Sequence, residues 1–178
     1  KNSHLSPFRL GFNYCIYLTS INVDSNNKYY LSEDGVLFNE DKSVLVRYPM
    51  GKKAEEYVIH ATVTTIGNYA FDNCDSLTSI TIPDSVTSIG NNAFSCCYYL
   101  TSITIPDSVT TIGSGAFDEC KRLTSITIEN PDCIIYGSES TISNSYMEDV
   151  FDGTIYGYEG STAQAYAEKY GRVFSPYE

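Results

Sequence analysis

Residues 77–99 read LTSITIPDSVTSIGNNAFSCCYY, and residues 100–122 read LTSITIPDSVTTIGSGAFDECKR. The two stretches match almost position for position, with a period of 23 residues. A third copy begins at Leu123 and then diverges, and residues 54–76 carry the same apolar pattern one period earlier. A fixed period of this length predicts a solenoid, in which stacked repeats bury a core that a single repeat could not bury. The identical turn residues in each copy favour a solenoid over a closed barrel.

Each repeat, or rung, carries apolar residues at fixed positions, which in residues 77–99 are Leu77, Ile80, Ile82, Val86, Ile89, Ala93, Phe94 and Cys97. The alternation Leu-x-x-Ile-x-Ile predicts a short strand with one face directed inward. Pro83 and Asp84 predict a turn after it, because proline donates no hydrogen bond to a sheet. Gly90 predicts a second tight turn. Ala93 and Phe94 are expected to enter the core from a helical turn.

The regions outside the regular repeats have their own signals. The pattern Phe-x-x-Cys-x-x-Leu of residues 71–77 also occurs at residues 12–18, which predicts a partial first rung over residues 1–23. Residues 24–53 form an insertion, in which turn signals predict three strands over residues 28–31, 36–38 and 44–48. We expect this small sheet to bulge from one side of the solenoid, where it would either carry function or cover an edge.

The C-terminal region loses the regular period after Ile128. The 27 residues from Ile128 to Ile155 predict one rung with about four extra residues. Ser161 and Gln164 form a capping-box pattern, and Gly171 suits the residue after a helix, so a helix is expected over residues 161–171. Its apolar face would close the end of the core, and the following Val-Phe pair would add an edge strand.

The repeat pattern of residues 54–128 resembles the BspA-like leucine-rich repeat family of bacterial surface proteins. The stretch TIYGYEGSTAQAYAEKYGRVF, residues 154–174, is similar to the closing segment of that family. The pieces DGVLF and RYP of the insertion are similar to its longer rungs. The resemblance implies a secreted or surface-attached protein that is often much longer than this chain. Adhesion or partner binding is the role that it implies, without fixing a ligand.

The fold class predicted is therefore an α/β leucine-rich-repeat solenoid, right-handed, with about five rungs, short parallel strands, a small β insertion and a helical C-terminal cap. We expect one domain, belonging to a longer protein, with a partial first rung over residues 1–23, a β insertion over 24–53, regular repeats over 54–128, and an irregular rung with the cap over 129–178.

Charge and hydropathy exclude several partners. The chain carries 22 acidic and 11 basic residues, a formal charge of −11. This charge argues against nucleic acid or an anionic membrane surface as the main partner. No run of 18 apolar residues occurs, so we expect no membrane insertion by this segment.

Catalytic motifs are missing from the sequence. Only two histidines occur, His4 and His60, and His60 stands where Pro83 stands one rung later, so it is interpreted as a turn residue. No Gly-x-Ser-x-Gly motif provides a nucleophile. A pair of glycosidase carboxylates is not excluded by composition, but Asp84 and its equivalent in the next rung are explained as turn residues. We expect no enzyme activity and no cofactor.

Cysteines form a column rather than a metal site. Cys15, Cys74, Cys97 and Cys120 occupy the same position in their rungs, which predicts buried free thiols stacked as small apolar groups. Parallel side chains in such a column cannot easily reach the torsion of a disulfide. The spacing lacks Cys-x-x-Cys pairs and nearby histidines, so no zinc site is expected. The repeated aspartates could hold calcium, but Ala61 interrupts their column, and we predict no metal.

Two surfaces are candidates for binding. Serines and threonines repeat on the outward side of the first strand of each rung, forming a flat hydroxyl face that suits an exposed strand as well as a docking surface. Tyrosine offers a large contact area at a low entropic cost. The candidate binding residues are therefore Tyr14, Tyr17, Tyr29, Tyr30, Tyr98 and Tyr99.

We therefore expect a monomeric, non-catalytic module, extracellular or on a bacterial cell surface. It would bind a host protein, a glycan or another cell. The alternative is a structural spacer that displays other domains on the bacterial surface. A hydrolase ranks below both, for want of a nucleophile or an acid pair.

Overall fold

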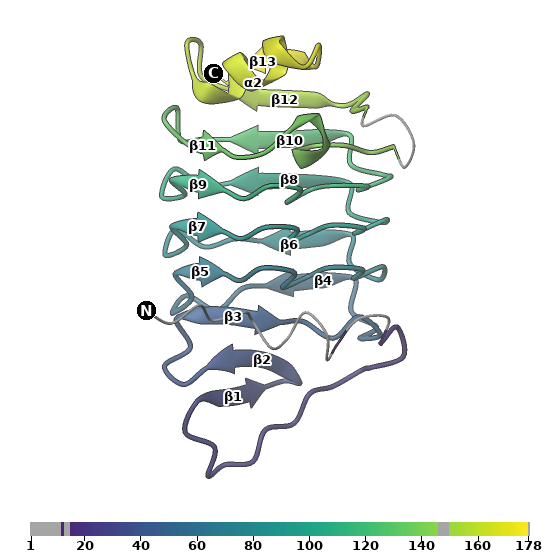
Figure 1. Ribbon diagram of the computed structural model, residues 1–178, viewed down its shortest axis with the longest axis vertical. Coiled ribbons are helices and arrows are strands. Elements are labelled where there is room, and N and C mark those ends of the chain that lie inside the picture. Colours follow the sequence, from purple (N-terminus) through teal and green to yellow (C-terminus); the bar gives the residue numbers. More distant parts are fainter. Residues whose placement is uncertain (1–11, 13–14, 146–149, 178) are drawn as a thin grey trace.

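The computed structural model describes residues 12, 15–145 and 150–177 and shows a stack of rungs along one long axis (Figure 1). The solenoid predicted from the 23-residue period is confirmed. On one side of the stack lie the strands β4 (Glu56–Val58), β6 (Ser79–Thr81), β8 (Ser102–Ile105), β10 (Ser125–Ile128), β12 (Thr154–Gly157) and β13 (Val173–Pro176). On the other side lie β5 (Thr65–Ile66), β7 (Ser88–Ile89), β9 (Thr111–Ile112) and β11 (Ile134–Ile135).

Neighbouring rungs pair in parallel with the register that the repeat dictates. Ser125 of β10 pairs with Ser102 of β8, and Thr111 of β9 pairs with Ser88 of β7, each one period apart. Inward residues such as Ile103 are therefore stacked on their equivalents and buried, whereas Ser102 and Thr104 face solvent. Burial of the same apolar set in every rung makes one continuous core.

Aromatic rings form a second ladder inside this core. The Phe71 and Phe94 ring centroids are 5.1 Å apart, with 9° between the ring planes. Phe94 and Phe117 are 5.2 Å apart with 5° between planes. Tyr48 of the insertion continues the stack, 5.3 Å from Phe71. All four rings are fully buried, so each rung is held to the next by ring contact as well as by strand pairing.

The helical turn expected at Ala93–Phe94 is instead a run of irregular turns. Asn92 has φ 53° and Cys96 has φ 56°, both in the left-handed region. The equivalent residues one rung later, Gly115 and Glu119, have φ 66° and 55°. A right-handed helix cannot continue through such residues. The part of the chain that the structure describes therefore contains one α-helix, at its C-terminal end.

Gly90 serves close packing between rungs rather than a left-handed turn. A Cβ on Gly90 would lie 2.6 Å from the backbone N of Asn68 and 2.7 Å from the carbonyl carbon of Gly67. A Cβ on Gly113, one rung later, would lie 2.6 Å from the backbone N of Asn91. Only glycine permits this approach of two backbones, and this need explains its repetition.

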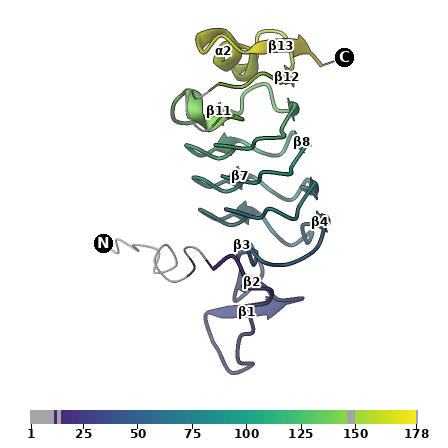
Figure 2. The ribbon, with the colours of Figure 1, turned by 90° about the vertical axis from the view of Figure 1, so that its right-hand side faces the viewer.

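The insertion forms the expected three strands, but it does not bulge. The strand β2 (Val36–Asn39) pairs antiparallel with both β1 (Tyr30–Glu33) and β3 (Val44–Arg47). β3 then pairs in parallel with β5, through Val44 and Thr65. The insertion therefore extends the β5–β11 sheet and covers the N-terminal end of the core, as Figure 2 shows. The expectation of a lateral bulge is wrong. β5 pairs with β7 along one edge, and its other edge is available for pairing with β3.

The irregular rung is longer than expected. Ile126 of β10 pairs with Ile155 of β12, a shift of 29 residues and not 27. The rung thus holds six extra residues instead of about four. Part of this excess lies around the short 3-10 helix η1 (Glu139–Thr141), which Ser138 caps.

The predicted cap is confirmed. Helix α2 (Thr162–Lys169) begins at Ser161, whose Oγ accepts a hydrogen bond from the Gln164 amide at 3.2 Å. Gln164 Oε1 accepts from the Gly160 amide, one residue before the position that a capping box predicts. Gly171 has φ 63°, as expected after a helix. β13 pairs with β12, and α2 covers the end of the core.

Candidate functional site

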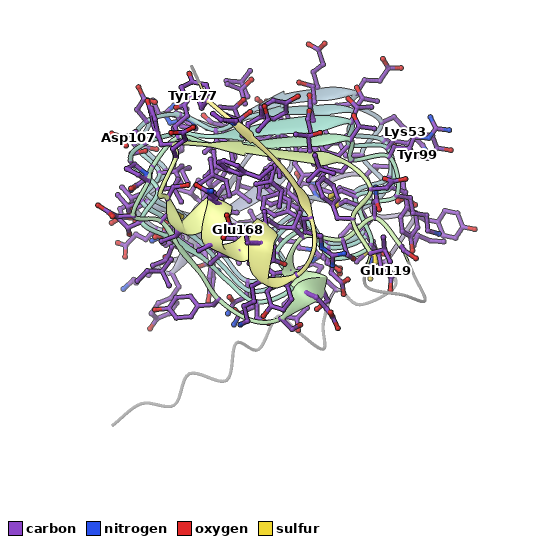
Figure 3. The ribbon with its side chains drawn as sticks, turned by 90° about the horizontal axis from the view of Figure 1, so that it is seen from above. Lys53, Tyr99, Asp107, Glu119, Glu168 and Tyr177 are labelled. Atoms are coloured by element: carbon purple, nitrogen blue, oxygen red, sulfur yellow. The ribbon has the colours of Figure 1, made fainter. Side chains whose placement is uncertain are left out.

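One edge of the stack carries aromatic and basic side chains in register (Figure 3). It lies where each rung turns from its buried cysteine into the next outward strand. Thr101 N donates to Thr78 O and Thr124 N to Thr101 O, so the residues just before these threonines are aligned from rung to rung. We define the basic corner as the surface formed by eight residues of this edge: Lys52, Lys53, Asp75, Ser76, Tyr98, Tyr99, Lys121 and Arg122. Figure 3 shows Lys53 and Tyr99 together at this edge, with Asp107 at the opposite end of the sheet.

Cations of one rung hold the tyrosine rings of the rung before. Lys121 Nζ lies 4.0 Å from the centre of the Tyr98 ring, and Arg122 Cζ lies 4.3 Å from the centre of the Tyr99 ring. Cation–π contacts at exposed sites contribute about 0.5–1 kcal/mol. Tyr98 is half-buried, and this burial raises the pKa of its hydroxyl. Tyr99 is 43% exposed, so its ring is both oriented and accessible.

The basic corner has a local charge opposite to that of the whole chain. It holds four cations and one carboxylate, in a protein of net charge −11. The Tyr98 backbone N–H donates to the carbonyl of Cys96 at 2.9 Å. Burial raises the pKa of Asp75, and the nearby Tyr98 backbone, Lys121 and Lys53 act in the opposite direction.

None of the four cations of the corner forms an ion pair with a described residue. Two ion pairs occur within residues 12, 15–145 and 150–177: Lys42 with Glu33 at 2.7 Å, and Arg47 with Asp72 at 3.8 Å. Lys52 Nζ donates to the carbonyl of Asp34 at 2.7 Å. The other three cations of the corner, Lys53, Lys121 and Arg122, are exposed and form no ion pair with any described residue.

The predicted tyrosines divide between two places. Tyr98 and Tyr99 lie in the basic corner. Tyr17 is 89% exposed and lies against its N-terminal end, because Gly51 N donates to Leu18 O at 2.8 Å. Tyr29, 75% exposed, and the partly buried Tyr30 lie in the insertion instead. Tyr14 lies outside the described residues.

Sequence reasoning missed the basic partners of these tyrosines. Their signal was present, since Lys53, Tyr99 and Arg122 are separated by multiples of the repeat period. Tyrosines were selected by residue type alone, and the cations of neighbouring rungs become visible only when the rungs are aligned.

The hydroxyl face is partly structural. Thr101 Oγ1 donates to Thr78 O at 3.5 Å, and Thr124 Oγ1 donates to Thr101 O at 3.2 Å, so this column bonds the backbone of the preceding rung. The outward serines and threonines of β6 and β8 remain exposed. With Asp84 and Glu129 they line a shallow polar hollow of about 410 Å³. Its regular hydroxyls offer hydrogen bonds but no nucleophile with an activating base.

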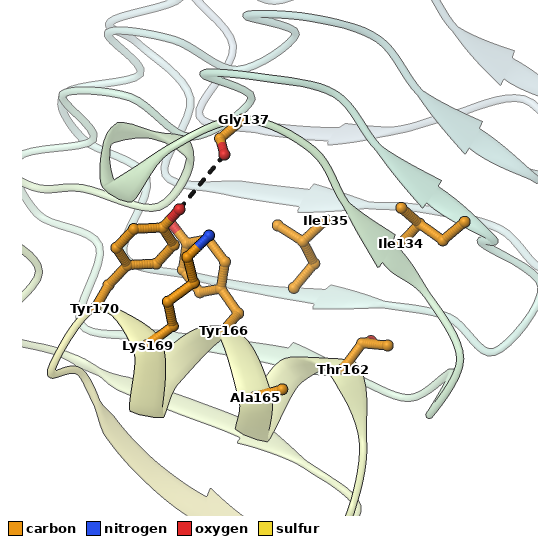
Figure 4. Close-up of a pocket in the computed structure, with 8 residues that line it drawn as sticks. All are labelled: Ile134, Ile135, Gly137, Thr162, Ala165, Tyr166, Lys169 and Tyr170. Atoms are coloured by element: carbon orange, nitrogen blue, oxygen red, sulfur yellow. Dashed lines mark hydrogen bonds between the residues drawn. The ribbon is translucent and has the colours of Figure 1, made fainter.

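A second hollow, of about 290 Å³, separates α2 from β11 (Figure 4). Its lining is mostly apolar, with Ile134 and Ile135 on one wall and Tyr166 and Tyr170 on the other. Tyr170 Oη donates to the carbonyl of Gly137 at 3.5 Å. Lys169 lies beside this ring, its Nζ 4.7 Å from the Tyr170 ring centre. The arrangement offers apolar contact to a small group and no acid–base pair.

The turn interpretation of His60 is confirmed. His60 is exposed, and its Nδ1 accepts a hydrogen bond from the Thr62 amide at 3.2 Å. Its carbonyl accepts from Val63 N, as that of Pro83 accepts from Val86 N one rung later. His4 lies outside the described residues.

The thiol column is buried as predicted from Cys74 to Cys120, while Cys15 is half-buried. Cys97 Sγ donates to the carbonyl of Phe71 at 3.1 Å, and Cys120 Sγ to that of Phe94 at 3.2 Å. Burial raises the pKa of Cys97 well above its usual range. Cys96 is partly exposed, but burial and the nearby Glu119 raise its pKa too, which makes it a poor nucleophile.

No group of three or more His, Cys, Asp or Glu side chains within the described residues is arranged to hold a metal ion. No helix among them has the length and apolar character needed to cross a bilayer.

Several bacterial proteins of known structure are similar to this chain. A leucine-rich repeat protein from Eubacterium ventriosum is 31% identical, with a TM-score of 0.65 over 79% of this chain and 37% of that protein. A leucine rich cell surface protein from Faecalibacterium prausnitzii is 30% identical, with a TM-score of 0.60 over 85% of this chain and 44% of that protein. The pneumococcal vaccine antigen PcpA, 19% identical with a TM-score of 0.57 over 90% of this chain and 50% of that protein, shares the fold.

The chain thus spans half or less of each of these three structures. A search of curated proteins finds no match to the sequence. The sequence matches the family model described as BspA type leucine rich repeat region over residues 50–152, more than half of the chain, in six copies. The chain therefore belongs to the BspA-type leucine-rich repeat family.

Proposed function

We propose that this protein is a non-catalytic, extracellular module that binds a protein partner on or near a bacterial surface. A solenoid with one continuous core provides a rigid scaffold for such binding, because each rung is fixed by its neighbours. The description of the Faecalibacterium relative as a cell surface protein supports this location.

The observation that carries the proposal is the state of Tyr99. Its ring is accessible, yet Arg122 packs against it at 4.3 Å. Tyrosine and arginine dominate the energetics of protein interfaces, and an oriented ring loses little entropy on binding. The basic corner therefore presents a preorganised contact surface on the turns that precede the strands of the rungs.

An array of extracellular-matrix proteins, host glycans and bacterial surface proteins, probed with the purified chain, tests this function. We expect saturable binding to a protein, weakened at least tenfold in the double variant Tyr98→Ala/Tyr99→Ala. The matched control is Tyr29→Ala, which removes an exposed tyrosine outside the corner and should bind as the unaltered chain does. Loss of binding in Tyr29→Ala alone would move the site to the insertion.

A structural spacer is the second candidate. It is favoured by the core, which continues without interruption from the insertion to the C-terminal helix. An array without any saturable partner would contradict the binding function and leave the spacer as the better account.

A further inference from the structure

We propose that the basic corner binds an acidic, extended polypeptide segment that runs along the solenoid axis. This inference rests on the protein-binding function proposed above and adds the chemistry and direction of the partner. It depends on three observations: the spacing of the cations, their lack of carboxylate partners, and the position of Asp75.

The spacing of the cations suits an extended chain. Neighbouring strands lie about 4.8 Å apart, so Lys53 and Arg122, three rungs apart in register, are separated by about 14 Å. An extended polypeptide advances by about 3.4 Å per residue, so two carboxylates four residues apart span the same distance. The exposed ring of Tyr99 lies between the two cations and would contact the residues that separate the carboxylates.

The charges of the corner complement such a segment. Lys53, Lys121 and Arg122 are exposed without an ion pair among the described residues, although acidic residues outnumber basic ones two to one in this chain. The repulsion from distant acidic residues is screened beyond about 8 Å at physiological ionic strength. A ligand in contact with the corner therefore meets the four local cations, together with the carboxylates of Asp75 and of Glu119, both of which act on Tyr98. The planar guanidinium of Arg122 can bind a carboxylate with two parallel hydrogen bonds.

Asp75 favours a peptide over a uniformly charged polymer. Its exposed carboxylate lies in the corner one rung after Lys52 and Lys53. A sulfated glycan with charges along its whole length would place an anion against Asp75. A peptide can place a neutral residue there and keep its carboxylates for the cations on either side.

Peptides of known sequence test this inference directly. The first probe is a twelve-residue peptide of glycine and serine with two glutamates four positions apart. The second replaces both glutamates by glutamine, and the third probe is heparin. We would titrate each into the isotope-labelled chain at 50 and 300 mM NaCl and follow the backbone amide signals of the corner.

We expect the glutamate peptide to bind at least fivefold more tightly than the glutamine peptide at 50 mM NaCl, and to weaken at 300 mM. Lys53→Gln and Arg122→Gln should each weaken binding at least threefold, and the double variant at least tenfold. Lys169→Gln is the matched control, because Lys169 is also exposed and also packs against a tyrosine, at 4.7 Å. It should bind as the unaltered chain does.

Three results would overturn the inference. The two peptides could bind equally, or Lys169→Gln could weaken binding as much as Arg122→Gln does. Heparin could bind the same residues more tightly than the glutamate peptide, which would identify a sulfated glycan as the ligand.

The same experiments distinguish failure of this inference from failure of the proposed function. If a partner found in the array binds the Lys53→Gln/Arg122→Gln variant as tightly as the unaltered chain, the basic corner is not the binding site, but the proposed function is retained. If the array shows no partner while the glutamate peptide binds the corner, the function falls and the site stands.

Discussion

Two columns of side chains follow the regular rungs of this solenoid with the same period, one inside and one at the basic corner. The inner column repeats its residue: the Phe94 ring lies 5.1 Å from that of Phe71 and 5.2 Å from that of Phe117. The corner column changes at every rung, from Lys53 to Ser76, Tyr99 and Arg122. Stacking therefore constrains the identity of a residue only where its neighbours in the rungs above and below fill the space around its side chain. Residues at the corner are free to serve a partner.

The largest expected effect comes from breaking the inner column. Phe94→Ala removes a fully buried ring that contacts two others, and such changes cost about 3–5 kcal/mol. Tyr99→Ala should cost less than about 1 kcal/mol, because its ring is partly exposed. Urea unfolding followed by circular dichroism measures both. Similar losses for the two variants would contradict the distinction between the columns.

The next effect concerns the close approach of rungs at Gly90. Gly90→Ala forces a Cβ to within 2.7 Å of the backbone of the preceding rung, and overpacking of this kind costs about 1–3 kcal/mol. Gly160→Ala is the control, since its φ is 77° but no atom lies within 4 Å of the added Cβ. It should cost only the left-handed strain, about 1 kcal/mol. A larger loss for Gly160→Ala would show that turn conformation, not rung contact, selects these glycines.

The thiol column predicts a loss of stability at alkaline pH. Burial raises the pKa of Cys74, Cys97 and Cys120 above the ordinary thiol value near 9, so the folded state keeps protons that the unfolded state releases. The unfolding free energy should therefore be constant below about pH 8 and fall as pH rises above it. Unfolding curves from pH 7 to 10 check this. Replacing Cys97 by Ala should reduce the slope, and an unchanged slope would exclude the thiols as its cause.

The smallest expected effect concerns Cys96, at a left-handed turn, compared with its buried neighbour Cys97. Cys96 adopts φ 56°, a conformation that costs an ordinary residue about 1–2 kcal/mol. Cys96→Gly should therefore stabilise the protein by about 0.5–1 kcal/mol in thermal unfolding. Cys97→Gly, at the buried neighbour, should destabilise it, because a side chain is removed from the core. Destabilisation by both changes would show that the Cys96 thiol contacts matter more than the backbone strain.

The sequence predicted the features that recur in every 23-residue repeat and missed those that lie outside the repeat or that its apolar positions do not specify. Rung height, strand faces and the buried phenylalanines followed from apolar positions alone. The left-handed turns were missed: Asn92 and its equivalent Gly115 are residue types that favour this region, but Cys96 and its equivalent Glu119 adopt it without any such signal. The placement of the insertion depends on pairing between β3 and β5. The repeat pattern does not predict this pairing, because β3 lies in the insertion, outside the regular repeats.

The C-terminal rung and the corner show two further limits. The shift of 29 residues between Ile126 and Ile155 could not be counted through a segment without repeat markers. In the candidate site, exposed tyrosines were predicted by residue type, but Arg122 reaches Tyr99 only through the register of two rungs. Contacts between rungs are invisible until the period is applied to polar residues as well as to apolar ones.

The central claim is that the basic corner is free of structural duty and available for a partner. The most direct test compares Lys53→Gln/Tyr99→Ala/Arg122→Gln with the unaltered chain in two measurements, urea unfolding and titration with the glutamate peptide. The account predicts an unfolding free energy within about 1 kcal/mol of the unaltered value and binding weakened at least tenfold. A variant that unfolds far more easily, or that binds the peptide unchanged, would contradict it.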